Sequence, residues 1–363
     1  MATHNAVVTV GLKAPLEIRQ VPTTPPTKGE VRVRVEWTAS TPLDLHQNDG
    51  GLLVKHPQIL GDGTAGTVVE IGPGVNNLKV GDKVFGFTFR EQKEKAHQEF
   101  CTSLETNFGK VPEGFTLQEA ITLPNNFVTV FHAVTTDFEL PLPWPKPAGY
   151  VPPHSQDPIL IWGGSSSVGQ FALQILKYYG YQKLITTSSK RHHEFLKSLG
   201  ASETFDYNDA DVSSAILNSA TKGSSGPAIS FILDCIGSQD GSIRPIAKIA
   251  QKDTKVAILL PVVVKDSSET TAPEYSMDVQ TAAKWEAGVD VRGVRTHFYA
   301  NNEFFRDHLQ TEVMPTMLKE GIVTPNKQRI IEGNTLLERA QKAMDIMRRK
   351  EQSGERLVWR VSE

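Results

Sequence analysis

The segment ILIWGGSSSVGQFALQILKYYG, residues 159–180, restricts the possible folds more than any other part of the chain. It begins with apolar residues, passes through two glycines and three serines, and continues as an amphipathic pattern. The apolar residues of that pattern stand at helical spacing: Val168, Phe171, Ala172, Ile175, Leu176 and Tyr179. A buried strand, a tight turn and a helix in this order are typical of a loop that binds phosphate at the helix N-terminus.

The loop aligns with the dinucleotide fingerprint G-x-G-x-x-G, although a serine replaces the second glycine. In that fingerprint the first glycine makes the turn, the second admits the pyrophosphate, and the third lets helix and strand pack closely. We predict that this loop binds a dinucleotide through Gly164, Ser165, Ser166, Ser167, Val168 and Gly169. The Ser166 hydroxyl would then face the pyrophosphate. The alternative is a glycine-serine turn in an α/β domain that binds no ligand.

The residues after the second strand of this unit distinguish NAD from NADP. NAD sites usually place Asp or Glu there, about 20 residues after the loop, to bind the ribose 2′-hydroxyl. This chain instead has Ser188, Ser189, Lys190 and Arg191, and the next carboxylate is Glu194 in the following helix. Hydroxyls and cations suit a 2′-phosphate, so we predict NADPH. The alternative is a solvated basic helix start, which the helix dipole disfavours.

Strands alternate with helices through the middle of the chain. A strand is expected at 183–188, a helix at 191–200, and buried strands at 229–237 and 255–264. This alternation predicts a parallel, doubly wound sheet.

The first third of the chain has a different pattern. Val31, Val33 and Val35 alternate with charged residues in 30–40, and 64–87 contains short strands separated by Gly, Pro and Asn. We therefore expect a small barrel-like β domain. Near the end, Thr335 and Glu338 form a capping-box pattern before a helix, and the chain closes on the strand-like RLVWRV.

These patterns together predict an α/β protein with a Rossmann domain at 127–296 inserted in a β-rich domain formed by 1–126 and 297–363. The proline-rich stretch 142–158 is expected to be a stiff surface loop, and 265–276 a polar loop. If 255–264 lies at the edge of the sheet, the 265–276 insert could cover that edge. We therefore favour a monomer over a homodimer.

Composition excludes several classes of protein. The formal net charge is −3, with 22% charged and 39% hydrophobic residues, which gives no reason to expect nucleic acid or a membrane surface as a partner. The N-terminus does not have the pattern of a signal peptide, and no apolar run is long enough to span a membrane. Only Cys101 and Cys235 occur, so neither a disulfide scaffold nor a four-cysteine zinc site is possible. We expect a reduced, cytoplasmic protein.

Several motifs resemble the medium-chain dehydrogenase/reductase superfamily over nearly the whole chain. GDGTAGTVVEIGPGVNNLKVGDKVFGF (61–87) is similar to the signature of its GroES-like β domain, and the 160–180 loop to its cofactor loop. SLGASETFDYND (198–209) and FILDCIG (231–237) match later Rossmann strands. SGERLVWRV (353–361) resembles the terminus of the fungal branch that includes trans-acting enoyl reductases of polyketide biosynthesis.

The resemblance implies further cofactor contacts. By motif, Tyr207 takes the position of a tyrosine that joins the 2′-phosphate site; the alternative is a packed aromatic ring with its hydroxyl at the surface. Cys235, Gly237 and Leu260 are assigned to the cofactor site, although Cys235 is also expected to be an inert buried thiol. Asp234 is expected to shape the C-terminal edge of the sheet.

Zinc-dependent members of the superfamily bind zinc through an early cysteine and a His-Glu pair. Here Asp62 and Gly63 replace that pair, and no cysteine lies near residue 41. A catalytic zinc needs about three protein ligands. We therefore predict a zinc-free enzyme. The resemblance then implies a member that reduces polarised C=C bonds or quinones by hydride transfer from NADPH.

Candidate catalytic residues lie in STPLDLHQ (40–47) and LPNNFVTVFHA (123–133). Thr41 stands where the family often has asparagine, so it is a pocket residue, a helix N-cap, or both. His46 stands where the fungal enzymes tend to have lysine and could donate a proton, although a lone histidine is more often structural. Thr129 matches a threonine of the nicotinamide pocket. Asn126, with its neighbour Asn125, is either a donor to substrate or a turn residue.

Two functions are consistent with these residues. The first is an NADPH-dependent reductase of a small-molecule or carrier-bound enoyl substrate or of a quinone, with a polyketide synthase as a partner in the carrier-bound case. The second is a catalytically weak NADPH-binding protein with a regulatory or structural role, suggested by the missing asparagine at position 41.

Overall fold

The computed structural model describes residues 2–220 and 226–362. The chain forms two compact units. Unit 1 contains Met1–Val128, Ser267–Pro273 and Ala300–Glu363, and unit 2 contains Thr129–Asp266 and Glu274–Tyr299. Each unit is described below by itself.

Unit 2 is built on a six-stranded sheet in which all neighbours are parallel. Its strands, in spatial order, are β11 (Glu203–Asp206), β10 (Leu184–Ser188), β9 (Ile159–Trp162), β12 (Phe231–Asp234), β13 (Lys255–Leu259) and β16 (Asp290–Val294). In chain order this is the 3-2-1-4-5-6 arrangement of the Rossmann fold, with its switch point between β9 and β12. The prediction of a doubly wound sheet is confirmed.

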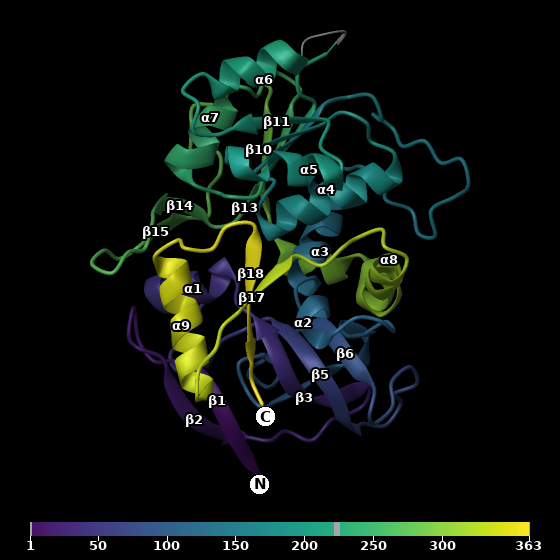
Figure 1. Cartoon of the computed structure of the whole chain (residues 1–363), viewed down its shortest axis with the longest axis vertical. Helices are drawn as coiled ribbons and strands as arrows, with labels where there is room; N and C mark the ends of the chain where they lie inside the picture. The colour runs from purple at the N-terminus through teal and green to yellow at the C-terminus, as the bar shows by residue number, and fades with distance from the viewer. Residues whose placement is uncertain (1, 221–225, 363) are drawn as a thin grey trace. The chain divides into compact units, whose positions relative to one another are not determined.

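Helical segments precede and connect these strands, several of them labelled in Figure 1. They are η3 (Ala133–Asp137), α4 (Ser167–Tyr179), η4 (Lys190–His192), α5 (His193–Leu199), α6 (Val212–Ala220), η5 (Gln239–Ile243) and α7 (Arg244–Ala247). The apolar residues expected on one face of α4 are all buried, as a helix packed on a sheet requires.

The prediction of a single strand at 255–264 is wrong. The structure has β13 there and, after Pro261, a separate strand β14 (Val262–Lys265) that pairs with β15 (Glu274–Ser276). Pro261 has no N–H to donate, so it cannot continue the ladder. β13 lies inside the sheet, between β12 and β16. The edge that the 265–276 insert was expected to cover is therefore β16, whose short, mixed sequence DVRGV gave no clear strand pattern.

Unit 1 is mainly β, as predicted. One sheet runs β17 (Lys327–Ile330), β18 (Glu355–Arg360), β3 (Glu30–Ala39), β5 (Gly63–Ile71), β6 (Lys83–Phe87) and β8 (Gly109–Lys110), with β7 (Phe100–Leu104) paired to β3. A smaller sheet runs β2 (Glu17–Pro22), β1 (Thr3–Thr9) and β4 (Gln58–Ile59). Because β18 pairs antiparallel with β3, segments from both ends of the chain share one sheet and core.

Unit 1 also carries helices, several of them visible in Figure 1. They are α1 (Pro42–Gly50), η1 (Gln92–Glu94), η2 (Glu105–Asn107), α2 (Leu117–Ala120), η7 (Phe305–Val313), α8 (Met314–Lys319) and α9 (Leu336–Arg348). Both α3 (Pro124–His132) and η6 (Thr296–Asn301) contain a point at which the units divide. Half of the predicted capping box of α9 forms: Thr335 Oγ1 accepts from the Glu338 N–H, whereas Glu338 Oε2 accepts from the N–H of Asn334, the residue before the N-cap.

A buried ion pair joins α1 to α9 within unit 1. Arg348 donates from Nε to Asp49 Oδ2 (2.8 Å) and from Nη2 to Asp49 Oδ1 (2.7 Å), and the Asp49 side chain is fully buried. Ser267 Oγ also donates to Asp49. Burial alone would raise the pKa of Asp49, but the bonds from Arg348 and Ser267 outweigh it and hold that pKa below its ordinary value.

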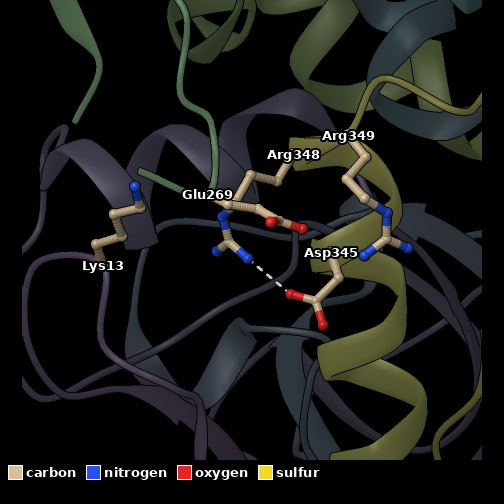
Figure 2. A pocket seen from close by; sticks show the side chains of 5 residues that line it. All are labelled: Lys13, Glu269, Asp345, Arg348 and Arg349. Carbon is tan, nitrogen blue, oxygen red and sulfur yellow. Dashed lines mark hydrogen bonds and ion pairs between the residues drawn. The ribbon is translucent and has the colours of Figure 1, made fainter. Parts of the chain in front are cut away.

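Arg348 also borders a surface pocket of about 270 Å³. The pocket is lined by Lys13, Glu269, Asp345, Arg348 and Arg349 (Figure 2). In Figure 2, Arg348 reaches toward Asp345, and Arg348 Nη1 lies 2.6 Å from Asp345 Oδ1. None of the residues predicted for the functional site lines this pocket.

We predict that Asp49→Ala lowers the free energy of unfolding by about 3–5 kcal/mol, because it leaves the Arg348 guanidinium buried and without its main partner. The matched control is Asp345→Ala, which removes a more exposed partner of the same arginine and should cost about 1 kcal/mol or less. Urea denaturation of the full chain measures both values. Equal losses for the two variants would contradict the dominant role of the buried pair.

Candidate active site

The loop between β9 and α4 has the shape that three glycines allow. Gly163 has a positive φ of 84°. A Cβ on Gly164 would lie 2.0 Å from Thr186 Oγ1, and a Cβ on Gly169 would lie 2.5 Å from the Gly163 oxygen. These distances are too short for any side chain, so the turn, the strand and the helix approach one another only because Gly164 and Gly169 lack one.

Ser166 serves as the N-cap of α4. Its backbone has φ −65° and ψ 159°, a conformation that suits serine, and its Oγ accepts from the Gly169 N–H at 3.1 Å. Accepting this bond leaves the Ser166 O–H able to donate, so the expected contact of the hydroxyl with a pyrophosphate stays a prediction. The first-turn amides of α4, from Ser167 and Val168, are the groups that this geometry offers to phosphate.

The residues predicted for the 2′-phosphate follow β10. Ser188 is buried at the end of the strand, Ser189 is half-buried, and Lys190 and Arg191 are exposed. Tyr207 follows β11 and is 47% exposed, so it is not the packed aromatic that was the alternative. These side chains therefore stand at the C-terminal ends of two neighbouring parallel strands, where ligands bind in open α/β sheets.

Sequence reasoning missed two carboxylates at this edge. Asp206 lies opposite Ser188 in the parallel register, and its Oδ1 accepts from the backbone N–H (3.0 Å) and Nδ2 (2.8 Å) of Asn208. These bonds hold the pKa of Asp206 below its ordinary value. Asp209 Oδ1 lies 3.8 Å from Lys190 Nζ. Asp206 could have been identified from the pairing of β10 with β11, because that pairing places it opposite Ser188.

The end of β12 is shaped by Asp234, as expected. Its Oδ1 accepts from the N–H groups of Ile236 (2.9 Å) and Gly237 (3.1 Å), and burial raises its pKa to about 6. Gly237 has φ 66°, and a Cβ there would lie 2.6 Å from the Leu259 oxygen. Cys235 is partly exposed as a residue, but its thiol is buried, and burial raises the pKa of that thiol well above its ordinary value, as expected of an inert thiol. Leu260, half-buried, joins β13 to β14.

In unit 1, α1 carries two of the predicted catalytic residues. Thr41 occupies the N-cap position and Pro42 is the first helical residue, but Thr41 Oγ1 makes no capping bond and has no hydrogen-bond partner among the described residues. The Thr41 N–H donates to Asp44 Oδ2 at 2.8 Å. His46 is half-buried one turn further along the same helix.

Asp44 is the buried centre of this region. Its Oδ1 also accepts from the Gly61 N–H at 3.1 Å. Burial raises the pKa of Asp44 to about 6, although the two backbone donors and the charges of Arg356 and Lys95 act in the opposite direction. Asp44 thus ties the start of α1 to the chain just before β5.

His97 packs beside Asp44 and is almost wholly buried. Its Nε2 lies 3.9 Å from Asp44 Oδ2, and its ring lies 4.6 Å from that of Trp359. Burial, together with the charge of Lys95, lowers the pKa of His97 to about 3. The imidazole is therefore neutral near pH 7.

The remaining candidates lie on α3. Asn125 Nδ2 donates to Asp62 Oδ2 at 3.0 Å, and the buried Asn126 donates to the Thr122 oxygen at 3.4 Å. Within unit 2, Thr129 Oγ1 lies 3.0 Å from Thr296 Oγ1. Across residues 2–220 and 226–362, no group of three or more His, Cys, Asp or Glu side chains is placed to hold a metal ion. In the same residues, every helix is too short or too polar to cross a membrane.

Two family models match the chain: the Alcohol dehydrogenase GroES-like domain over residues 27–133, and the Zinc-binding dehydrogenase over residues 167–259. The trans-enoyl reductase tazE of Aspergillus terreus is 30% identical over 264 residues, which are 70% of this chain and 83% of that protein. The chain belongs to the medium-chain dehydrogenase/reductase superfamily. Within it, the chain lies on the enoyl reductase-like branch.

Two other relatives have different coverage. The dehydrogenase pigH of Monascus ruber is 34% identical over 235 residues, and the match spans 61% of this chain and 62% of that protein. The enoyl reductase component lovC of the lovastatin nonaketide synthase of Aspergillus terreus is 26% identical over 350 residues, 92% of this chain and 90% of that protein.

Among solved structures, the quinone oxidoreductase of Coxiella burnetii has a TM-score of 0.72 and 23% identity, and the match covers 99% of this chain and all of that one. This likeness establishes the fold. Members of the superfamily are oxidoreductases that use a nicotinamide cofactor. The loop of this chain fits such a cofactor, because Gly164 and Gly169 leave no side chain between the turn and the helix N-terminus.

We predict that His97→Phe makes the protein less sensitive to acid. Unfolded histidine binds a proton near pH 6.5, whereas folded His97 resists protonation down to about pH 3. The parent therefore loses stability as the pH falls through this window, by up to about 1.4 kcal/mol per pH unit for one proton. In urea titrations at a series of pH values, the free energy of unfolding of the variant should fall less steeply with decreasing pH. The difference between the two slopes should be at most that value.

The control for this prediction is His308→Phe, which removes an exposed histidine. Comparing the two variants separates the effect of burial at His97 from the effect of deleting a histidine at the surface. If His97→Phe and the parent fall in parallel with decreasing pH, His97 is not the group that resists the proton.

Proposed function

We propose that this protein is an NADPH-dependent, zinc-independent reductase of polarised C=C bonds, in enoyl thioesters or enones, or of quinones. The observation that carries the proposal is the glycine-shaped turn at the switch point of a 3-2-1-4-5-6 sheet, in a chain related to trans-enoyl reductases. That turn supports a dinucleotide, and the relatives support reduction of a C=C bond.

The choice of NADPH rests on the edge formed by β10 and β11. Lys190 and Arg191 supply positive charge, and Ser189 and Tyr207 supply hydroxyls that can donate to a phosphate. This arrangement favours a 2′-phosphate over a free 2′-hydroxyl.

The proposed chemistry needs little from the protein besides position and charge. Bound NADPH supplies a hydride, and negative charge then develops on the substrate carbonyl oxygen. Thr41, Asn126 and Thr129 would orient the substrate and the nicotinamide through their hydroxyl and amide groups, and His46 is a candidate for the proton. Hydrogen bonds to the developing oxyanion are worth most in a site that excludes water.

Zinc independence is supported by what the candidate ligands do. Asp62 stands where zinc-dependent members have histidine, and it accepts from Asn125. Asp44 accepts from two backbone N–H groups. Both carboxylates therefore have a structural use that requires no metal.

The partner proposal follows from the relatives. One of them is named as the enoyl reductase component of a polyketide synthase, which supports a carrier-bound enoyl substrate and a partner synthase for this chain. A monomeric state and a cytoplasmic location stay predictions from the sequence.

We predict that the purified protein oxidises NADPH in the presence of crotonyl-N-acetylcysteamine, 2-cyclohexenone or 1,4-benzoquinone, with the enoyl thioester giving the highest kcat/KM. Dialysis against EDTA should leave the rate unchanged. The assay follows NADPH absorbance, with metal content measured on the same sample. Tight NADPH binding without consumption of NADPH would instead support the non-catalytic alternative, and zinc-dependent turnover would contradict the metal-free mechanism.

The double variant Lys190→Ser/Arg191→Ser should weaken NADPH binding by about 10–100-fold and leave NADH binding within about threefold, because it removes charge-assisted bonds to the 2′-phosphate. Isothermal titration of each cofactor measures the two constants. The control is Lys197→Ser on α5, where Lys197 pairs with Glu194. Equal losses for NADPH and NADH would show that the pair does not recognise a phosphate.

A further inference from the structure

Lys95 is a buried cation in unit 1 without a direct partner. It follows η1 in the connection between β6 and β7, and only 8% of its surface is exposed. Within residues 2–220 and 226–362, its Nζ makes no hydrogen bond and no ion pair closer than 4.0 Å. Its Nζ still reaches solvent, but burial of the rest of the side chain penalises the charged form.

The backbone places Lys95 beside the candidate active site. The Ala96 N–H donates to the Gly61 oxygen (3.1 Å), and the His97 N–H donates to the Leu60 oxygen (3.0 Å). This pairing sets Lys95 against the segment that contains Gly61 and Asp62. That segment also binds the start of α1 through Asp44.

Three acids act on the charge of Lys95: Asp62 most strongly, then Asp44, then Glu94. Each is already bound by other donors. Asp62 accepts from Asn125, and Asp44 accepts from two backbone N–H groups. Glu94 accepts from the Arg90 and Glu91 N–H groups and from Ser103 Oγ. The three carboxylates thus attract the ammonium from a distance and leave its donors for another acceptor.

Arg356 of β18 is a second cation of the same cluster. It is 7% exposed, its Nη2 donates to the Ala39 oxygen at 3.5 Å, and its Nε has no partner among the described residues. Asp62 and Asp44 also act on its charge. A guanidinium stays protonated in proteins, so of the two cations only Lys95 can give up a proton.

We propose that the Lys95 ammonium binds the carbonyl oxygen of the substrate and supplies the proton that completes the reduction. This role rests on the proposed reductase function. Hydride adds to the β-carbon, the C=C π pair moves toward the carbonyl, and the oxygen becomes an enolate held by Nζ–H. The α-carbon then takes a proton from Nζ. The neutral amine is reprotonated by water, so NADPH and one proton yield NADP⁺ and the saturated product.

Burial is the largest influence on the pKa of Lys95 and lowers it, whereas Asp62, Asp44 and Glu94 raise it; the net result is a pKa below the ordinary 10.5. Lys95 in turn helps to keep His97 neutral. Lys95 therefore loses its proton at a lower pH than a surface lysine. Activity should fall on the alkaline side as Lys95 is deprotonated. Because the folded state disfavours the charged form, removing the charge should not destabilise the fold.

The test uses the full-length enzyme with NADPH and crotonyl-N-acetylcysteamine. Lys95→Met should lower kcat by about 10²–10³-fold, with a Tm equal to or above that of the parent. Lys95→Arg keeps the charge and should recover part of the rate, but its profile should lose the alkaline fall, since arginine does not titrate there. The control is Lys93→Met on η1, where Lys93 pairs with Glu30; it should keep the parental kcat.

The possible failures can be told apart. If the parent enzyme turns over and Lys95→Met retains kcat within about threefold, the role of Lys95 is refuted and the reductase function stands. The role of Lys95 is also refuted, and the reductase function stands, if the kcat of the parent enzyme does not fall at alkaline pH. That measurement needs no variant. If the parent binds NADPH but reduces none of the acceptors, the reductase function fails, and the proposed role of Lys95 fails with it.

Discussion

The close approach of α4 to the turn after β9 is the steric constraint on which the cofactor-binding unit depends. A methyl group on Gly164 or Gly169 would overlap Thr186 or the Gly163 carbonyl, so the helix could not begin where it does. The helix therefore begins directly after β9, one of the two strands at the switch point. Ser166 then adds the cap that fixes this end of the helix. The serine that seemed to replace a required glycine occupies a backbone position that needs none.

Unit 1 is organised by charge that its fold removes from water. Asp44 joins α1 to the chain before β5, and Asp49 joins α1 to α9. The two carboxylates differ in their partners. Arg348 compensates Asp49 directly, whereas Asp44 has backbone donors and only distant cations. An ion pair such as Asp49–Arg348 is sufficient for structure, but buried charges without direct partners weaken a fold and are kept mainly where chemistry needs them.

Sequence patterns could predict elements whose signal is local. The alternation of Val31, Val33 and Val35 and the spacing of the α4 residues depend only on which face is buried, so both segments were found. The break at Pro261 and the edge strand β16 depend on which strand lies next to which. The burial of Lys95 is the clearest case. The segment REQKEKAHQEF is rich in charged residues and gives no local sign of burial, and only its pairing with residues 60–61, more than 30 residues away, buries Lys95.

The two lysines assigned to function use the same charge under different physical conditions. A 2′-phosphate is an anion before it binds, so the exposed Lys190 can recognise it in water, where the attraction is weak and depends on salt. A substrate oxygen becomes anionic only as hydride arrives, and its charge must be met at that moment. In the proposed mechanism Lys95 stabilises this developing negative charge from a buried position. There the attraction is stronger and the ammonium need not reorganise. That position costs folding stability, and it also lowers the pKa that makes the ammonium a proton donor.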